Sequence, residues 1–474
     1  MICKPNEHVI LLGGGIAGLA TGLELARSGR RVTVIEKGKV VGGLARTYIK
    51  GDFRFDVGGH RFHSHKPEII RWVQDLMGPD LLRVPRISHI YLQGKFVDYP
   101  IRFPNALSIF SPAQSARVIS SYAAATVRQR LNGQVPDVSF EDWVVRRFGR
   151  AMYDVFFGPY TEKVWGIPCN ELSADWAAQR ISLPSLSETV KRAIVPGSEP
   201  PATIISHFWY PRAGFGMIPE RMAAEIQRLG GRIITGAGVT GLTLLPDGRW
   251  QVTIEGQDGG DTLDADRLIS SIPVNLLLRC LPVESGAHRI EKDFQLTYRD
   301  MVLLFLALKM PDGRSQVSDD SWTYFPQPEL LCGRTHEPRN WSPEMAPEGY
   351  TSLAAEVFTS RGEKAWESPD DQLVARATRD FESIGFLPAK SLHDAWVLRV
   401  PFAYPVYYVG YADKVRTVKD FLAANFPTLH LVGRTGAFRY MNSDGVIEDA
   451  LALTTYLTGE RDEYVDVSKN YKVD

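Results

Sequence analysis

Apolar residues recur along the chain in distinct rhythms, and each rhythm predicts a kind of element. Short apolar runs at residues 9–12 and 32–35 flank a helix-like segment, a pattern that predicts a β-α-β unit at the N-terminus. From about residue 106 to 192 the pattern is mostly helical: residues 113–131 are rich in alanine, valine, serine and arginine, and apolar residues of 140–157 recur every three or four positions. This middle segment is therefore predicted to be a helical insertion, and the aromatic residues of 140–157 are predicted to pack in its core.

The second half of the chain reads differently. Strand-like runs at 302–308, 322–325 and 352–358 alternate with loops, and one helical segment at 370–384 interrupts them. This pattern predicts an antiparallel sheet that carries a substrate face. A last strand before Gly433 and a helix at 445–457 are predicted to return to the first unit.

The first β-α-β unit contains a glycine pattern in a defined context. Gly13, Gly15 and Gly18 lie between the first strand and the helix, and Glu36 ends the second strand. Gly13 permits the tight turn, Gly15 lets a pyrophosphate approach the backbone, and Gly18 allows close packing of helix on strand. The helix N-terminus then faces the phosphates, and the Glu36 carboxylate is placed to accept hydrogen bonds from a ribose. We therefore predict a dinucleotide site.

A second G-x-G-x-x-G, at residues 236–241, is expected to be a coincidence. A Pro246-Asp247-Gly248 turn and another strand-like run, 250–254, follow it, which predicts a β-hairpin and not a phosphate-binding helix. A separate NAD(P)H domain is therefore not expected, and an electron donor such as NAD(P)H, if one is used, would enter the same cleft as the substrate.

Composition narrows the class of protein. The chain has 474 residues, which predicts two or three domains, and its formal net charge of −1 gives no basic excess for nucleic acid or an anionic membrane. Four cysteines lie far apart without a C-x-x-C pair, so neither a disulfide framework nor a metal site is expected. The first strand begins almost at once, and the longest apolar run, 301–310, is too short to span a bilayer. A soluble, cytoplasmic protein without membrane insertion is expected.

The segment after Glu36 indicates which dinucleotide the site binds. Gly42-Gly43 and Arg46-Thr47 follow the ribose acid closely. This arrangement resembles the flavoproteins of the amine oxidase and protoporphyrinogen oxidase type, in which the stretch continues along the FAD pyrophosphate to the flavin. The resemblance implies FAD as the cofactor.

Further segments are similar to one family, the UDP-galactopyranose mutases. These are Asp56 to Ser64, the octet Pro159-Tyr160-Thr161-Glu162-Lys163-Val164-Trp165-Gly166, Gly333 to Glu337, Tyr404-Pro405-Val406, and Gly433 to Asp444. The matches are in order along nearly the whole chain, and the octet is the most specific of them. The resemblance implies an enzyme whose reduced flavin attacks the anomeric carbon of a nucleotide sugar, with no net redox change.

The resemblance also assigns roles to residues. It implies His60, Arg334 and Tyr404 as catalytic residues, and Tyr160, Trp165, Arg180, Arg334, Tyr404 and Arg439 as substrate-binding residues. Residues expected to bind FAD are Gly13, Gly15, Ile16, Ala17, Gly18, Glu36, Lys37, Gly43, Leu44, Ala45, Arg46, Gly58, Gly59, His60, Val239, Gly433, Arg434, Asp444, Gly445 and Val446. No metal ligand is expected.

Simpler roles stay open for three of these residues. His60 could be a solvent-facing turn histidine, Arg334 could pair with Glu337 on an exposed loop, and Tyr404 could be a core residue of an edge strand. One position also departs from the mutase pattern: Pro184 stands where the mutases have a second diphosphate-binding arginine. The rival hypothesis is therefore a redox flavoenzyme of the protoporphyrinogen oxidase or amine oxidase type.

The predicted fold is α/β. A Rossmann-like FAD-binding domain, discontinuous in sequence, takes residues 1–65, 207–285 and 425–474. A mainly helical domain takes residues 104–200, and an antiparallel-sheet substrate domain takes residues 66–103 and 290–420.

Overall fold

The computed structural model describes residues 2–99, 110–132, 135–180, 206–256, 259–467 and 471. Its first layer is a parallel sheet of five strands in the order β19-β13-β1-β2-β9. The bounds of these strands, in the same order, are Leu429–Leu431, Arg267–Ser270, His8–Leu12, Arg31–Glu36 and Arg232–Thr235. The central strand β1 is almost wholly buried, as expected of a parallel strand covered on both faces.

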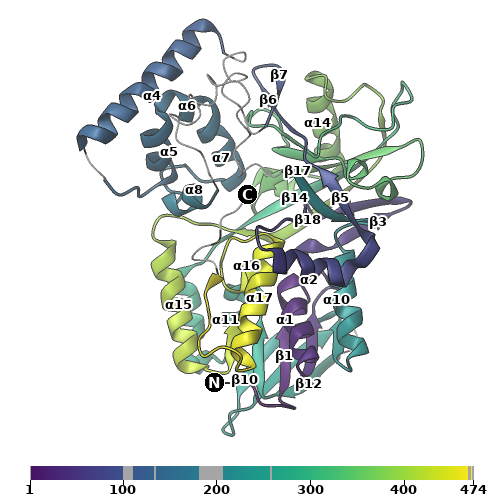
Figure 1. Cartoon of the computed structure of the whole chain (residues 1–474), viewed down its shortest axis with the longest axis vertical. Coiled ribbons are helices and arrows are strands. Elements are labelled where there is room, and N and C mark those ends of the chain that lie inside the picture. The colour runs from purple at the N-terminus through teal and green to yellow at the C-terminus, as the bar shows by residue number, and fades with distance from the viewer. Residues whose placement is uncertain are drawn as a thin grey trace.

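Helices cover one face of this sheet, as Figure 1 shows in its lower half. They are α1 (Ile16–Arg27), α10 (Met217–Arg228) and α17 (Ser443–Leu457). The helix α2 (Pro67–Met77), from the predicted substrate domain, packs on α10 and α17 of the predicted FAD-binding domain. On the other face lie an antiparallel sheet of three strands, β10 (Ala237–Leu244), β11 (Trp250–Gly256) and β12 (Gly259–Ala265), and the helices α11 (Val274–Cys280), α12 (Ala287–Phe294) and α15 (Tyr411–Asn425). The second glycine pattern lies in the β10–β11 hairpin, which confirms that it does not open a helix.

The second sheet has seven strands in the order β18-β14-β17-β16-β15-β6-β7. Their bounds, in that order, are Leu392–Pro405, Tyr298–Leu308, Thr351–Thr359, Arg334–His336, Trp322–Tyr324, Ser88–Leu92 and Lys95–Asp98. The predicted antiparallel arrangement holds for every pair except β15 and β6, which run parallel. The departure arises because β6 comes from the segment before the helical insertion, far from β15 in sequence.

Side chains of the long strand β14 are buried on both faces of this sheet. Successive side chains of a strand point to opposite faces. Val302, Leu304 and Leu306 pack towards α14 (Asp370–Ser383), whereas Leu303 and Phe305 pack against the hairpin of β3 (Thr47–Lys50) and β4 (Phe53–Asp56). That hairpin directly follows the second glycine segment, so the sheet is fixed next to the predicted flavin site.

The helical insertion lies at the top left of Figure 1, apart from the parallel sheet. It consists of α4 (Pro112–Asn132), α5 (Phe140–Phe148), α6 (Arg150–Met152), a π-helical turn (Tyr153–Phe157), α7 (Gly158–Trp165) and α8 (Ala174–Arg180). A capping box between Ser139 and Asp142 starts α5. Phe140, Val144 and Tyr153 are buried in the core, as predicted for the aromatic positions of this segment.

Two strands join the predicted domains. They are β5 (Leu81–Pro85) and β8 (His207–Pro211), which pair with each other. Elsewhere, the short helix α16 (Gly433–Gly436) contacts both α1 and α17. The remaining short elements are α13 (Lys364–Glu367) and 3-10 turns at Gly43–Ala45, Gly78–Asp80, Val283–Ser285, Pro338–Asn340 and Pro343–Met345. The carboxyl ends of the parallel strands, the loop after β4 and the seven-stranded sheet therefore meet in the middle of the molecule.

Candidate flavin and substrate site

The turn between β1 and α1 is built around its glycines. Gly13 has a positive φ of 102°, and a Cβ on Gly18 would lie only 2.1 Å from the Gly13 carbonyl oxygen. Gly15 is extended, and a Cβ on it would meet no atom within 4 Å. Ile16 and Ala17 begin α1, where first-turn N–H groups have no partner within the helix. The turn thus presents backbone donors beside open space.

Glu36 closes this turn. One of its carboxylate oxygens accepts the Gly14 N–H at 2.9 Å and the other accepts the Gly38 N–H at 2.7 Å. The neighbouring Lys37 lies against Gly238, one residue before Val239 on β10. The carboxylate is therefore held at the rim of the cradle, at the end of β2.

The second glycine segment packs directly on the first. The Gly42 N–H donates to the Gly14 carbonyl oxygen at 2.7 Å, and a Cβ on Gly43 would lie 3.4 Å from the Gly15 Cα. Leu44 and Ala45 follow, and the guanidinium of Arg46 lies 4.4 Å from the centre of the Tyr48 ring. The Arg46 Nε is buried and has no hydrogen-bond partner. Such an orphaned donor, beside a cradle of glycines, fits a bound dinucleotide such as FAD.

The loop after β4 is anchored by a buried carboxylate. Asp56 accepts hydrogen bonds from Thr47 at 2.5 Å, Tyr210 at 2.5 Å and the Phe215 N–H at 3.0 Å. Burial raises the pKa of Asp56 to about 6, although these donors oppose the rise. The network fixes the start of the Gly58-Gly59-His60 loop against β8 and α10.

His60 is held within that loop. Its ring stacks on Phe215 with 5.1 Å between centroids and 22° between planes. It also bonds the backbone of Leu44 and Val57. Burial, and then the positive charge of Arg434, lower the pKa of His60 to about 4, so the imidazole is neutral near pH 7. A solvent-facing turn histidine does not fit these contacts.

The C-terminal segment forms another wall. Gly433 has a φ of +79°, and a Cβ on it would lie 2.4 Å from the Ala17 side chain. Its N–H donates to the buried Asp449 carboxylate at 2.9 Å. Arg434 donates from Nε and Nη2 to the Met441 carbonyl oxygen, at 2.7 and 2.5 Å. This segment packs on the start of α1 and so adjoins the glycine cradle.

The first turn of α17 carries Asp444, Gly445 and Val446. The Tyr471 hydroxyl donates to Asp444 at 2.8 Å and accepts the Asn442 N–H at 3.0 Å. A Cβ on Gly445 would lie 2.5 Å from the Tyr471 ring. A ligand that reached this helix end would therefore meet Tyr471.

Arg334 and several phenols gather where β16 begins. Nε and Nη2 of Arg334 donate to one carboxylate oxygen of Glu356, at 3.0 and 2.6 Å, and Glu356 is fully buried. Burial alone would lower the pKa of Arg334, but Glu356, helped by Tyr404 and Tyr160, raises it well above its ordinary value. Arg334 thus pairs with Glu356 on a strand, and the alternative of an exposed pair with Glu337 is wrong.

Aromatic rings line the same region. Tyr160 meets Tyr324 edge-on at 5.9 Å, and Tyr404 stacks on Tyr440 at 5.7 Å. The Arg434 guanidinium lies 5.5 Å from the Tyr404 ring centre and 5.0 Å from that of Tyr440. Two arginines and four phenols therefore surround one region next to His60.

The remaining predicted substrate residues lie elsewhere. Trp165 is 3% exposed and packs edge-on against Trp176 at 4.5 Å, behind Tyr404 and Tyr440. Arg439 donates to Asp449 at 2.8 Å and to Asp466 at 3.0 Å, within a buried network that does not include Arg334. Arg180 ends α8, and its side chain and Pro184 lie outside the described residues.

Sequence reasoning missed Glu356 and Tyr324. Glu356 also accepts the Gly59 N–H at 3.2 Å, so one carboxylate links Arg334 to the loop that carries His60. The signal for Glu356 was present, because a lone acid inside the apolar run Leu353 to Phe358 implies a buried partner. Tyr324 gave no signal before its cross-strand pairing with Arg334 was known.

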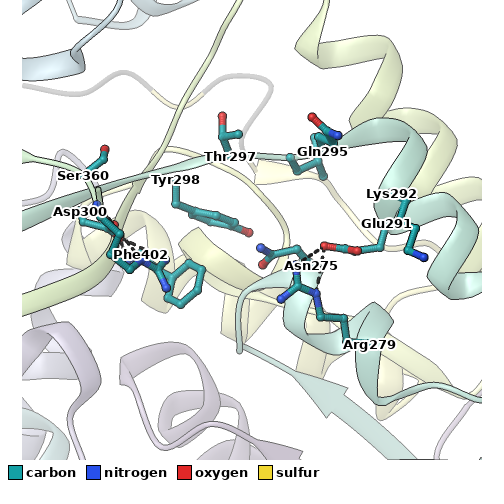
Figure 2. A pocket seen from close by; sticks show the side chains of 12 residues that line it. Asn275, Arg279, Glu291, Lys292, Gln295, Thr297, Tyr298, Asp300, Ser360 and Phe402 are labelled. Atoms are coloured by element: carbon teal, nitrogen blue, oxygen red, sulfur yellow. Dashed lines mark hydrogen bonds and ion pairs between the residues drawn. The ribbon is translucent and has the colours of Figure 1, made fainter. Parts of the chain in front are cut away.

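A cavity of about 590 Å³ lies at another place, between α11, α12 and the start of β14 (Figure 2). Figure 2 shows the Tyr298 ring between Asn275 and Phe402, and the ion pair of Arg279 with Glu291. None of its 12 lining residues is a predicted flavin or substrate residue. Most of its charged groups already pair with one another, as do Arg361 and Asp300 at 3.0 Å.

Within the described ranges, no cluster of three or more histidine, cysteine or acidic side chains could hold a metal ion. No helix in that part of the chain is long and apolar enough to cross a membrane. All four cysteines are free.

Comparisons with known proteins agree with this architecture. The family described as flavin containing amine oxidoreductase matches residues 16–452. The structure of a reduced UDP-galactopyranose mutase superposes with a TM-score of 0.83 over 98% of both chains, at 22% identity. At that identity the likeness shows the fold alone.

The curated relatives include proteins of different activities. Human protoporphyrinogen oxidase is 25% identical over 309 residues, which are 59% of this chain and 63% of the relative, so less than two thirds of the relative's length is matched. Coproporphyrinogen III oxidase of Bacillus subtilis (strain 168) is 20% identical over 90% of this chain and 93% of the relative. A probable UDP-galactopyranose mutase of Klebsiella pneumoniae is 27% identical over 36% of this chain and 44% of the relative.

Proposed function

The chain belongs to the flavin containing amine oxidoreductase family, and we propose that it is a FAD enzyme that acts on a nucleotide-linked sugar as a mutase. The reaction would exchange pyranose and furanose ring forms without net redox change. FAD, when bound and reduced, would supply a nucleophilic nitrogen for the anomeric carbon.

One observation carries this proposal: the convergence of Arg334 and Arg434 with Tyr160, Tyr324, Tyr404 and Tyr440. Guanidinium groups bind phosphate oxygens with planar, directed hydrogen bonds, and phenol hydroxyls both donate to and accept from sugar hydroxyls. An anionic, hydroxyl-rich substrate would provide hydrogen-bond partners for these guanidinium and phenol groups. A largely apolar substrate would leave these polar groups without partners, at a cost.

The cofactor would lie along the glycine cradle. Gly15 would face the pyrophosphate, in a turn that Gly13 and Gly18 make possible, Glu36 would face the ribose hydroxyls, and Arg46 would find a partner for its buried Nε. The loop with Gly58, Gly59 and His60 would approach the flavin ring.

His60 would act there as a neutral imidazole. Because its pKa is lowered to about 4, it carries no positive charge that would repel the two arginines or compete with them for phosphate. Its backbone neighbour Gly59 donates to Glu356, so the His60 loop and Arg334 share one carboxylate. This shared contact would keep the flavin loop and the anion-binding arginine in fixed relation.

A redox flavoenzyme is the second candidate. Two observations favour it: Arg334 is already neutralised by Glu356, and the Bacillus subtilis coproporphyrinogen III oxidase aligns along nearly the whole chain. An oxidase would take electrons from its substrate, so substrate addition would reduce the flavin.

Binding to oxidised holoenzyme tests the proposal without relying on turnover. Titration with UDP and with UDP-galactose should perturb the flavin absorbance without bleaching it. Absence of binding by UDP and by every sugar nucleotide tested would contradict a nucleotide-sugar enzyme.

A further inference from the structure

Lys163, in the octet that resembles the mutases, makes an unusual set of contacts. Its Nζ donates to the backbone carbonyl oxygens of Phe325 at 2.9 Å, Gln327 at 2.8 Å and Cys332 at 2.8 Å. A lysine ammonium has three donors, so all of them are used. All hydrogen bonds of the Lys163 ammonium therefore go to the loop of residues 325–332, and no donor is left for a ligand.

That loop joins the two strands that carry candidate substrate residues. Tyr324 ends β15 and Arg334 begins β16, and the two residues are direct cross-strand partners. The Phe325 N–H donates to the Gly333 carbonyl oxygen at 2.9 Å and closes the hairpin. A Cβ on Gly333 would lie 3.7 Å from the Lys163 Cε, so the lysine stem also lies against the residue before Arg334.

Helix α7 reaches this hairpin at a second point. Tyr160 and Lys163 are three residues apart and so share a helix face. The Tyr160 ring meets the Tyr324 ring at 5.9 Å, while Lys163 holds the loop that follows Tyr324. The helical insertion and the sheet therefore contact each other through two residues of one helix face, beside the candidate substrate region.

We propose that Lys163 is a positioning residue that sets the spacing between Tyr160 on α7 and Arg334 on β16, and thereby the affinity for substrate. This inference rests on the proposed function of the site. In this view the octet has two roles. Tyr160 contributes a ring to the candidate substrate region, and Lys163 connects the helical insertion to the hairpin of β15 and β16.

The charge state of Lys163 matters for this connection. Burial lowers the pKa of Lys163 to about 8. The charged and titratable groups that face it are the Cys332 thiol, Glu329, Asp380 and Arg376. Loss of a proton leaves two donors for three carbonyl acceptors, so the grip on the loop weakens above about pH 8. An arginine at this position would keep its charge across that range.

The test compares FAD-loaded Lys163→Met, Lys163→Arg and wild-type protein, with Lys309→Met as the matched control. Lys309 directly follows β14, and its Nζ lies 5.5 Å from the centre of the Tyr350 ring. Hydrogen exchange of the Phe325 and Gly333 amides is measured without substrate. UDP affinity, KM and kcat for UDP-galactose are then measured from pH 6.5 to 9.5.

In Lys163→Met we expect about tenfold faster exchange at these two amides, full FAD content, and a KM raised about tenfold with kcat little changed. In wild type and Lys309→Met we expect KM to rise above about pH 8, and in Lys163→Arg we expect this rise to disappear. Should Lys163→Met not fold, the Lys163→Arg pH profile and its loop exchange decide alone.

Unchanged exchange in Lys163→Met, or a pH profile shared by wild type and Lys163→Arg, would overturn the inference. Faster exchange with unchanged UDP affinity would overturn it too, because the loop would then move without effect on the site. Failure of the proposed function looks different: wild type itself would bind no sugar nucleotide. In that case an unchanged loop exchange still rejects Lys163 as the positioning residue, and a faster one supports it.

Discussion

Arg334 and Glu356 form a buried ion pair in which two guanidinium nitrogens donate to a single carboxylate oxygen, at 3.0 and 2.6 Å. The second carboxylate oxygen accepts the Gly59 N–H at 3.2 Å. Glu356 therefore orients the arginine that would bind phosphate and the loop that would touch the flavin. Removal of Arg334 leaves the fully buried Glu356 carboxylate without its cation, so effects on stability and on binding must be separated.

Arg334→Met should weaken UDP binding by roughly 2–4 kcal/mol, because the anion loses its charged donor. It should also lower the free energy of unfolding, because Glu356 stays buried and unpaired. The double variant Arg334→Met/Glu356→Gln should recover much of that stability and none of the affinity. Calorimetric UDP titration and urea unfolding measure the two effects. UDP affinity equal to that of wild type in both variants would remove Arg334 from the substrate site.

Gly15→Val should give a folded protein without flavin. The backbone of Gly15 is extended, and no atom lies within 4 Å of where a Cβ would be, so valine fits the chain itself. The side chain would instead occupy the space predicted for the pyrophosphate. FAD content is read from absorbance after refolding with excess FAD, with Gly260→Val, on an exposed strand, as the control. A fully yellow Gly15→Val protein would show that the fingerprint is misassigned.

His60 predicts a pH dependence of stability. Its folded pKa of about 4 lies below the value of about 6.5 typical of an unfolded chain. The unfolded state therefore binds the extra proton between these values, and stability is lost as pH falls from about 6.5 to about 4. The free energy of unfolding of flavin-free wild type, minus that of His60→Asn, should rise with pH across this window and stay level above it. Parallel curves for the two proteins would mean that the pKa of His60 is not lowered in the folded protein.

Arg439→Met should act on stability and leave substrate affinity unchanged. Breaking the buried pair with Asp449 is expected to cost about 3 kcal/mol of unfolding free energy, because the Asp449 carboxylate loses its cation. UDP affinity, measured on the protein that remains folded, should equal that of wild type. A selective loss of affinity would restore the substrate role that the sequence resemblance implied.

Local sequence patterns were sufficient for much of the fold. The glycine turn, Glu36 and the flanking strands are close in sequence, and each element fits the same β-α-β unit. The continuous apolar run at 302–308 also predicted a strand, and the structure buries that strand, β14, on both faces. The rejection of residues 236–241 as a phosphate loop is confirmed as well, because the turn at 246–248 and the strand-like run after it form a hairpin with β10.

Contacts between segments that are distant in sequence could not be predicted from local sequence patterns. The Arg334–Glu356 pair depends on the register of β16 against β17, and the parallel pairing of β15 with β6 depends on the path of the chain around the helical insertion. Trp165 was expected to stack on substrate, because an aromatic residue in a motif gives no indication of its depth, and here it lies behind two tyrosines. Arg439 was expected at the substrate for a similar reason, although its acidic partners lie 10 and 27 residues further along the chain.

Turnover under controlled redox conditions tests the central proposal most directly. UDP-galactose is incubated anaerobically with oxidised enzyme and with enzyme reduced by a catalytic amount of dithionite, and the sugar products and the flavin spectrum are followed together. A mutase predicts a ring-isomerised product only with the reduced enzyme, no stoichiometric use of reductant, and loss of activity in His60→Ala. Bleaching of the oxidised flavin by substrate, or hydrogen peroxide formed in proportion to product when air is admitted, would contradict the mutase and identify an oxidase.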